Sequence, residues 1–97
     1  MLNVFRTGRS ALRSLVLASE AVAGGNWGQA GEYLNRLQRL EGEKPVDYYY
    51  YRGRVMQESA HLNEAQSALE SYVARAGVEG SHYQDALKRI KIGRAHV

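Results

Sequence analysis

Candidate nucleophiles, general bases and metal ligands are few in this chain of 97 residues, and their spacing suits neither catalysis nor metal binding. Cysteine is absent, which excludes disulfides, thiolate ligands and cysteine nucleophiles. His61 and His82 are far apart in the sequence, and neither has a second ligand at helical spacing. Glu41 and Glu43 flank a glycine in a linker, and no serine lies near a base of the kind that activates a nucleophile. We therefore expect no enzymatic activity, no catalytic residue, no metal and no cofactor.

The positive charge of the chain is concentrated near its start. The chain holds 13 basic and 10 acidic residues, and residues 1–19 contain three arginines and no acid. This segment resembles the basic opening of a targeting peptide. Its apolar run at 15–18 is, however, shorter than the about 7–15 residues of a secretory core or the about 18 of a membrane span. We expect a soluble protein with no signal peptide and no membrane span in this chain, which favours the cytoplasm.

The last six residues have an unusual origin. Residues 92–97 match the translation of a common sequencing adapter, so we interpret them as a non-native tail; a genuine basic tail is the alternative. Without the arginine of this tail, 12 basic and 10 acidic residues remain, a net charge of +2. We expect residues 1–91 to form a single domain that is a fragment of a longer protein.

The elements that must position any site are short helices. Glycines and the single proline divide the chain into segments with apolar residues at steps of three and four, the helical spacing. Three pairs resemble capping boxes, in which the second side chain bonds back to the first free backbone N–H: Asn26 with Gln29, His61 with Glu64, and Ser81 with Gln84. The predicted helices cover residues 10–23, 27–40, 47–59 and 62–76, and a fifth begins at residue 81.

The chain also repeats itself at a fixed period, which indicates a repeat architecture. A shift of 35 residues aligns Trp27 with Leu62, Ala30 with Ala65, and Leu34 with Leu69; a shift of 34 aligns Tyr49 with Tyr83. Each unit contains two helices joined by a tight turn.

These positions resemble the tetratricopeptide repeat family. The family pattern has an aromatic and a small residue in the first helix, a small and an apolar residue in the second, and a breaker at the end. Tyr49, Gly53, Ala65, Leu69 and Gly77 supply all five elements, with Tyr49 as the expected core aromatic and Gly53 crossing Ala65 closely. The chain departs from the pattern at Ser14, Arg52 and Tyr72 and in lacking a closing proline. The packing residues that match are Ala18, Trp27, Ala30, Leu34, Tyr49, Gly53, Ala65, Leu69 and Tyr83.

The resemblance implies an all-α fold in which antiparallel helix–turn–helix units stack as a short right-handed solenoid of about five helices. The units would span about residues 11–43 and 46–77, with a partial unit at 81–91.

A run of four tyrosines at 48–51 is the most informative feature for function. At about 100° per residue these side chains project all around one helix, so they cannot all be core. With Tyr49 in the core, Tyr50, Arg54 and Gln57 would line the inner face of the stack, where tyrosine and arginine often anchor partners. Gln84, Asp85 and Lys88 would continue this face in the next unit. We expect a groove for an extended peptide with acidic or C-terminal carboxylate character, formed by Tyr50, Arg54, Gln57, Gln84 and Lys88.

The function implied by the resemblance is a scaffold that binds a peptide or partner protein. One alternative is a helical-repeat RNA binder, similar to the pentatricopeptide family; the nearly neutral body, with nine bases and ten acids at 20–91, counts against it because phosphate neutralisation dominates such binding. Another is a structural spacer next to a catalytic or membrane domain outside this chain. We also expect self-association through the exposed last helix, around Leu87 and Ile90.

Overall fold

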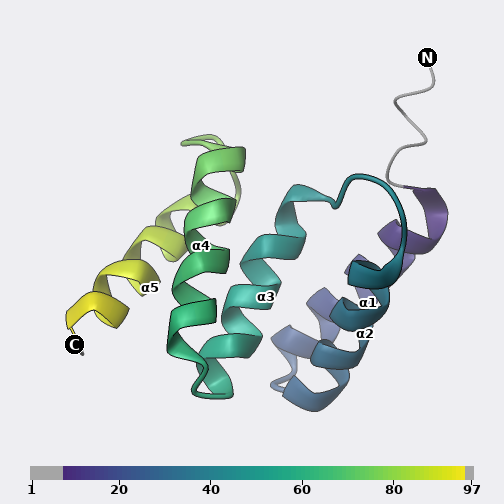
Figure 1. The fold of residues 1–97 in the computed structure, drawn as a ribbon, viewed down its shortest axis with the longest axis horizontal. Coiled ribbons are helices and arrows are strands. Elements are labelled where there is room, and N and C mark those ends of the chain that lie inside the picture. Colours follow the sequence, from purple (N-terminus) through teal and green to yellow (C-terminus); the bar gives the residue numbers. More distant parts are fainter. Residues whose placement is uncertain (1–7, 96–97) are drawn as a thin grey trace.

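Five α-helices make up the described part of the chain, which is residues 8–95 of this computed structural model (Figure 1). No strand occurs within these residues, so the predicted all-α class is confirmed. The closest packing is between α1 and α2 and between α3 and α4, and α3 also contacts α1 and α2. The helices are α1 (Gly8–Ala23), α2 (Trp27–Arg39), α3 (Val46–Glu58), α4 (Leu62–Ala76) and α5 (Tyr83–Ala95).

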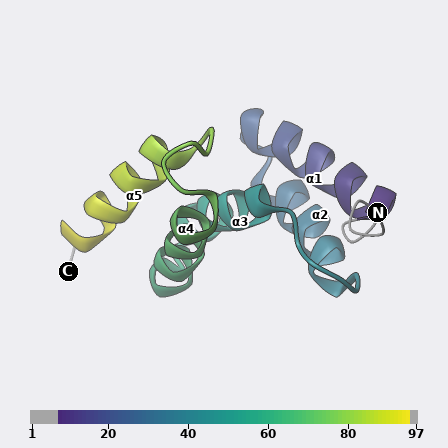
Figure 2. The same ribbon diagram turned by 90° about the horizontal axis from the view of Figure 1, so that it is seen from above.

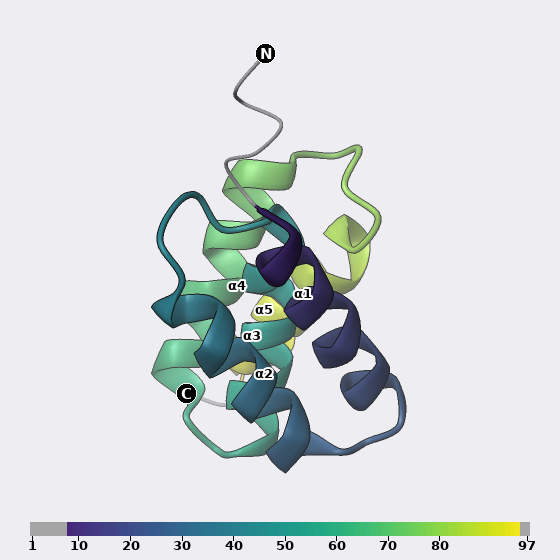
Figure 3. The same ribbon diagram turned by 90° about the vertical axis from the view of Figure 1, so that its right-hand side faces the viewer.

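The helices follow an arc when the molecule is viewed from above. Figure 2 shows α1 and α5 at the two ends of the arc, on the same side of it, with α3 between them and α2 and α4 on the other side. Turned by 90°, the hairpin of α1 and α2 faces the viewer and forms one end of the molecule (Figure 3). The long dimension of 44 Å runs along the arc, against 29 and 20 Å in the other directions.

The fifth helix begins later than predicted. Residues 77–82 form turns, with hydrogen bonds from the Gly80 N–H to the Gly77 carbonyl and from the Tyr83 N–H to the Gly80 carbonyl. His82, rather than Ser81, therefore precedes α5. Its own N–H donates to the Tyr72 hydroxyl at 2.9 Å, which holds the start of α5 against α4.

The predicted capping boxes are also wrong in detail. Asn26 and His61 do precede α2 and α4, but neither side chain bonds a backbone N–H of its helix. Asn26 instead donates from Nδ2 to Gln29 Oε1 at 2.8 Å. The backbone of the preceding turn, rather than a side chain, organises these helix starts.

The two hairpin turns are copies of each other at a spacing of 35 residues. Gly25 and Ala60 both have left-handed φ angles, 73° and 64°, and the residues after them, Asn26 and His61, share φ near −90° and ψ of 73°. In each turn the N–H of that following residue bonds a carbonyl five residues earlier, at 2.8 and 2.9 Å. This is the Schellman ending of a helix. The repeat seen in the sequence is therefore present in the backbone of the described residues.

The core consists of two apolar clusters with α3 between them. One cluster joins α1, α2 and α3 through residues such as Leu34, Leu37 and Tyr48; the other joins α3, α4 and α5 through Tyr50 and Tyr72, with Leu69, Ala86 and Ile90. Of the predicted packing residues, Ala18, Ala30, Leu34, Gly53, Ala65 and Leu69 are buried, whereas Trp27, Tyr49 and Tyr83 are half-buried.

The expectation that Tyr49 is the core aromatic of α3 needs correction. Tyr48 and Tyr50 are the buried tyrosines, at 5% and 4% exposure, and Tyr49 is half-buried between the two clusters. The reason is that α3 is covered on two sides. Residues 48 and 50 are about 200° apart around the helix, so one enters each cluster.

Gly53 provides the close approach between α3 and α4. A Cβ atom at this position would lie 2.6 Å from Leu69 Cγ and 3.5 Å from the Ala65 carbonyl oxygen. The absence of a side chain therefore lets Leu69, which is fully buried, pack directly on the backbone of α3.

The structure describes only part of the two ends of the chain. Residues 92–95, which we interpret as the start of a non-native tail, continue α5, and Arg94 Nη2 lies 3.1 Å from Glu70 Oε2. Residues 96–97 and 1–7 lie outside the described residues. No described helix combines the length and the apolar character needed to cross a membrane.

Candidate inner-face binding site

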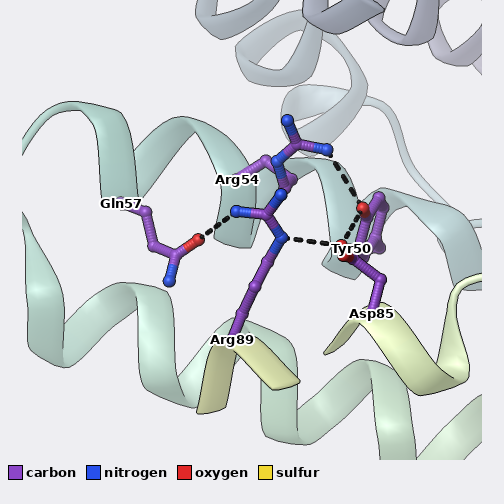
Figure 4. A network of polar contacts seen from close by, with 5 residues as sticks. All are labelled: Tyr50, Arg54, Gln57, Asp85 and Arg89. Atoms are coloured by element: carbon purple, nitrogen blue, oxygen red, sulfur yellow. Dashed lines mark hydrogen bonds and ion pairs between the residues drawn. The ribbon is translucent and has the colours of Figure 1, made fainter. Parts of the chain in front are cut away.

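A network of polar side chains connects α3 to α5 (Figure 4). The Tyr50 hydroxyl donates to Asp85 Oδ2 at 2.5 Å, and Arg89 Nε donates to the same oxygen at 2.6 Å. Arg89 Nη1 also donates to Gln57 Oε1, and Arg54 Nη1 donates to the Tyr50 hydroxyl, both at 3.0 Å. We call these five residues the inner-face network.

Helical spacing explains how each helix contributes its residues. Tyr50, Arg54 and Gln57 stand at i, i+4 and i+7 on α3, and Asp85 and Arg89 stand at i and i+4 on α5, so each set shares one helix face. The two faces meet because α3 and α5 both pack on α4, through Gly53 and through Ile90.

Aromatic packing fixes the ring of Tyr50. It stacks on the His82 ring at a centroid distance of 4.0 Å and an interplanar angle of 2°. His82 is itself held on two sides, since its backbone N–H bonds Tyr72 and its Nε2 lies 3.3 Å from the Tyr51 hydroxyl. The Tyr50 hydroxyl is therefore held in place relative to α5.

The network shifts the protonation equilibria of its members. Burial, followed by the hydrogen bond to Asp85, raises the pKa of Tyr50 above its ordinary value, although Arg54 opposes this. Burial disfavours ionised Asp85, but the hydrogen bonds from Tyr50 and Arg89 outweigh it and lower the pKa of this carboxyl group. Burial also disfavours the charged form of Arg89 and so lowers its pKa, but the hydrogen bond to Asp85 outweighs this, and the pKa of Arg89 is raised. At neutral pH the network therefore contains neutral Tyr50, ionised Asp85 and charged Arg89.

Arg54 is the member of the network whose positive charge is not paired with a carboxylate. Its guanidinium carbon lies 5.7 Å from the Trp27 ring centroid and 5.8 Å from that of Tyr50, and its Nε is buried without a hydrogen-bond partner. Asp85 forms an ion pair with Arg89, and no ion pair involves Arg54 among the residues that the structure describes. Two guanidinium groups against one carboxylate leave one positive charge in excess.

The five residues predicted to form one groove occupy two places. Tyr50, Arg54 and Gln57 belong to the network. Gln84 and Lys88 are exposed and line a separate surface cavity of about 400 Å³ with Leu87 and Lys91. The reason is rotation about α5, because residues 84 and 88 are each one position, about 100°, away from Asp85 and Arg89.

Sequence reasoning missed three residues of this site. Arg89 belongs to the network, and His82 and Tyr72 hold Tyr50 in place. The repeat gave no signal for Arg89, because the 34-residue shift that aligns Tyr49 with Tyr83 maps Arg54 onto Lys88. Ile90, predicted on the exposed face of the last helix, is buried at 7% exposure, whereas Leu87 is exposed. Self-association through this helix remains a prediction.

Over residues 8–95 no cluster of three or more histidine, cysteine or acidic side chains is placed to hold a metal ion. The groups available to a ligand are guanidinium donors beside aromatic rings, a combination suited to carboxylates and apolar side chains. No model of a known protein family matches the chain, and neither curated proteins nor solved structures include a match.

Proposed function

We propose that the chain is a tetratricopeptide-like module that binds a peptide or partner protein through its inner face, with units stacked as a short right-handed solenoid. The observation that carries this proposal is the direct contact between Tyr50 and Asp85, which joins the first helices of two successive proposed units. The matching hairpin turns at Gly25 and Ala60 support the period of the repeat. A repeat that aligns equivalent side chains on successive helices builds an extended binding surface.

The chemistry of the network favours a ligand with a carboxylate. Arg54 Nη1 donates to Tyr50, Nη2 makes no hydrogen bond among the described residues, and the guanidinium fork matches the two oxygens of a carboxylate. Trp27, which is half-buried beside Arg54, provides apolar surface on which the ligand chain can pack. The proposal gives Arg54 the role of anchor and gives Asp85, Arg89 and Gln57 the role of holding Tyr50 and α5 in position. None of these residues is assigned a catalytic role.

A peptide selection tests the proposal. Random peptides with free C-terminal carboxylates, displayed as a library, would be selected on the full chain, and the affinity of the best binders measured by fluorescence anisotropy. We expect Arg54→Ala to weaken binding by at least about tenfold, in line with loss of an anchoring arginine. Lys88→Ala is the matched control, because it removes one cation from the other face of α5 and should leave the affinity within about twofold.

Three outcomes would contradict the proposal. The first is a selection in which no peptide is enriched over a protein-free control. The second is an Arg54→Ala variant that binds the selected peptides as tightly as the original chain. The third is binding of single-stranded RNA with a steep dependence on salt, which would favour the RNA-binding alternative.

A further inference from the structure

A second candidate surface lies on the hairpin of α1 and α2. A cavity of about 410 Å³ is lined by Arg13 and Leu17 of α1, by Arg36 and Arg39 of α2 and by Leu40 just after it, together with two serines of α1. We call it the arginine groove. It shares no residue with the inner-face network.

The groove lies on the side of the hairpin that α3 does not cover. α2 meets α3 through Trp27, whose ring lies beside Arg54, and through Gly31, whose added Cβ would lie 3.8 Å from Val55. Residues 36 and 39 are on a different face of α2, and the hairpin forms one end of the molecule, facing the viewer in Figure 3.

The charges in the groove are not balanced by acids. Arg13, Arg36 and Arg39 are all exposed, and within residues 8–95 no ion pair reaches any of them. Arg36 lies over the Tyr33 ring, and Glu32, one turn before Arg36, lines an adjoining cavity without pairing with it. Three guanidinium groups around one cavity repel each other, and a ligand with negative charge would relieve that repulsion.

Helix stability explains only part of this clustering. Arg36 and Arg39 are in the last turn of α2, where positive charge interacts favourably with the helix dipole. Arg13 has no such role, because it lies in the N-terminal half of α1, a helix without an acid in its first turn. Its position beside Arg36 and Arg39 is therefore better explained by a ligand than by the needs of its own helix.

The shape of the surface suits an extended ligand. The groove adjoins a cavity of about 350 Å³ through Arg36 and Arg39, and one of about 210 Å³ through Leu17; Glu32 and Glu20 line these two neighbours, so the acid-free stretch is the groove itself. Leu17 and Leu40 place apolar surface between the arginines. An extended peptide could place alternate side chains on the arginines and on this apolar surface.

We propose that the arginine groove binds an acidic peptide segment in which carboxylate side chains alternate with apolar ones. Three unpaired guanidinium groups provide the charge complementarity, and Leu17 and Leu40 provide apolar contact. A single-stranded nucleic acid fits less well, because such ligands use several aromatic side chains for base stacking; none lines the groove itself, and Tyr33 in the adjoining cavity has Arg36 over its ring. The inference is independent of the inner-face proposal, since it rests on different residues.

The test uses a fluorescein-labelled peptide of alternating glutamate and leucine, titrated with the full chain and followed by anisotropy. We expect saturable binding that weakens as salt is added, because exposed charges are screened. The charge reversal R36E/R39E should weaken binding by at least about tenfold. K88E/K91E on α5 changes the net charge equally on another surface and should leave the affinity within about twofold, and Arg54→Ala should have no effect.

Three results would contradict binding of an acidic peptide in the arginine groove. Absence of binding at millimolar peptide, an equal loss for K88E/K91E, or tighter binding of single-stranded RNA would overturn the proposal. Circular dichroism would check that R36E/R39E is folded. If it is not, Arg13→Glu replaces it, because Arg13 is exposed on α1 and a surface substitution there changes stability little; the same loss of peptide binding is expected.

Discussion

Tyr50 on α3 donates a hydrogen bond of 2.5 Å to Asp85 on α5, 35 residues further along the chain. The contact links two helices that are joined in the sequence only through α4. Arg89 donates directly to the same oxygen of Asp85, and Arg54 donates to the hydroxyl of Tyr50, so this hydroxyl connects Arg54 to the carboxylate.

Removal of this hydroxyl should destabilise the protein. Tyr50→Phe leaves Asp85 without its tyrosine donor and Arg54 without its acceptor, while the ring can still stack on His82. We expect a loss of about 1–3 kcal/mol in the free energy of unfolding, measured by urea denaturation. Tyr83→Phe is the control, because the Tyr83 hydroxyl has no hydrogen bond among the described residues, and it should change stability by less than about 0.5 kcal/mol. Equal effects of the two changes would show that the network contributes nothing to stability.

The crossing of α3 and α4 predicts an asymmetry between two glycines. Gly53→Ala would place a Cβ 2.6 Å from Leu69, so we expect a loss of about 1–3 kcal/mol from overpacking. Gly31→Ala places its Cβ at an ordinary contact distance of 3.8 Å from Val55 in the middle of α2, and the better helix propensity of alanine should stabilise the protein by up to about 1 kcal/mol. Thermal unfolding of both variants measures the difference. A Gly53→Ala variant as stable as the original chain would show that α3 and α4 do not cross this closely.

The paired hairpin turns predict opposite effects of exchanging alanine and glycine. Ala60 has a φ of 64°, a left-handed conformation that a Cβ disfavours, so Ala60→Gly should stabilise the protein by about 0.5–1 kcal/mol. Gly25 has the same conformation in the other turn, and a Cβ there would meet no atom within 4 Å, so Gly25→Ala should cost a similar amount through backbone strain alone. Urea unfolding of the two variants checks both signs. Destabilisation by Ala60→Gly would contradict the equivalence of the turns.

Alkaline pH should destabilise the protein through its tyrosines. Burial is the main cause that raises the pKa of Tyr48, Tyr50 and Tyr51 in the folded state. A group with a raised folded pKa stabilises the protein fully below its unfolded pKa, about 10 for tyrosine, and this contribution is lost as pH rises through the folded value. We expect the unfolding free energy to fall above about pH 10, and to fall less steeply in Tyr50→Phe. Identical pH profiles for the two proteins would exclude Tyr50 as a contributor.

Much of the fold could be predicted from the sequence because the signals for it are local. The spacing of apolar residues places all five helices, and Gly25 and Gly77 mark turns where the backbone has positive φ. The 35-residue period also predicts which residues are equivalent, and it pairs Ala30 with Ala65 and Leu34 with Leu69, all of which are buried.

The sequence by itself therefore determined the helices, their turns and the repeat, whereas tertiary structure decided which side chains meet. The packing of α3 between two clusters buries Tyr48 and Tyr50 instead of Tyr49, and the rotation of α5 brings Asp85 and Arg89, rather than Gln84 and Lys88, to Tyr50. The physical reason is that one residue step turns a helix face by about 100°, and the crossing of neighbouring helices sets which face is turned inward.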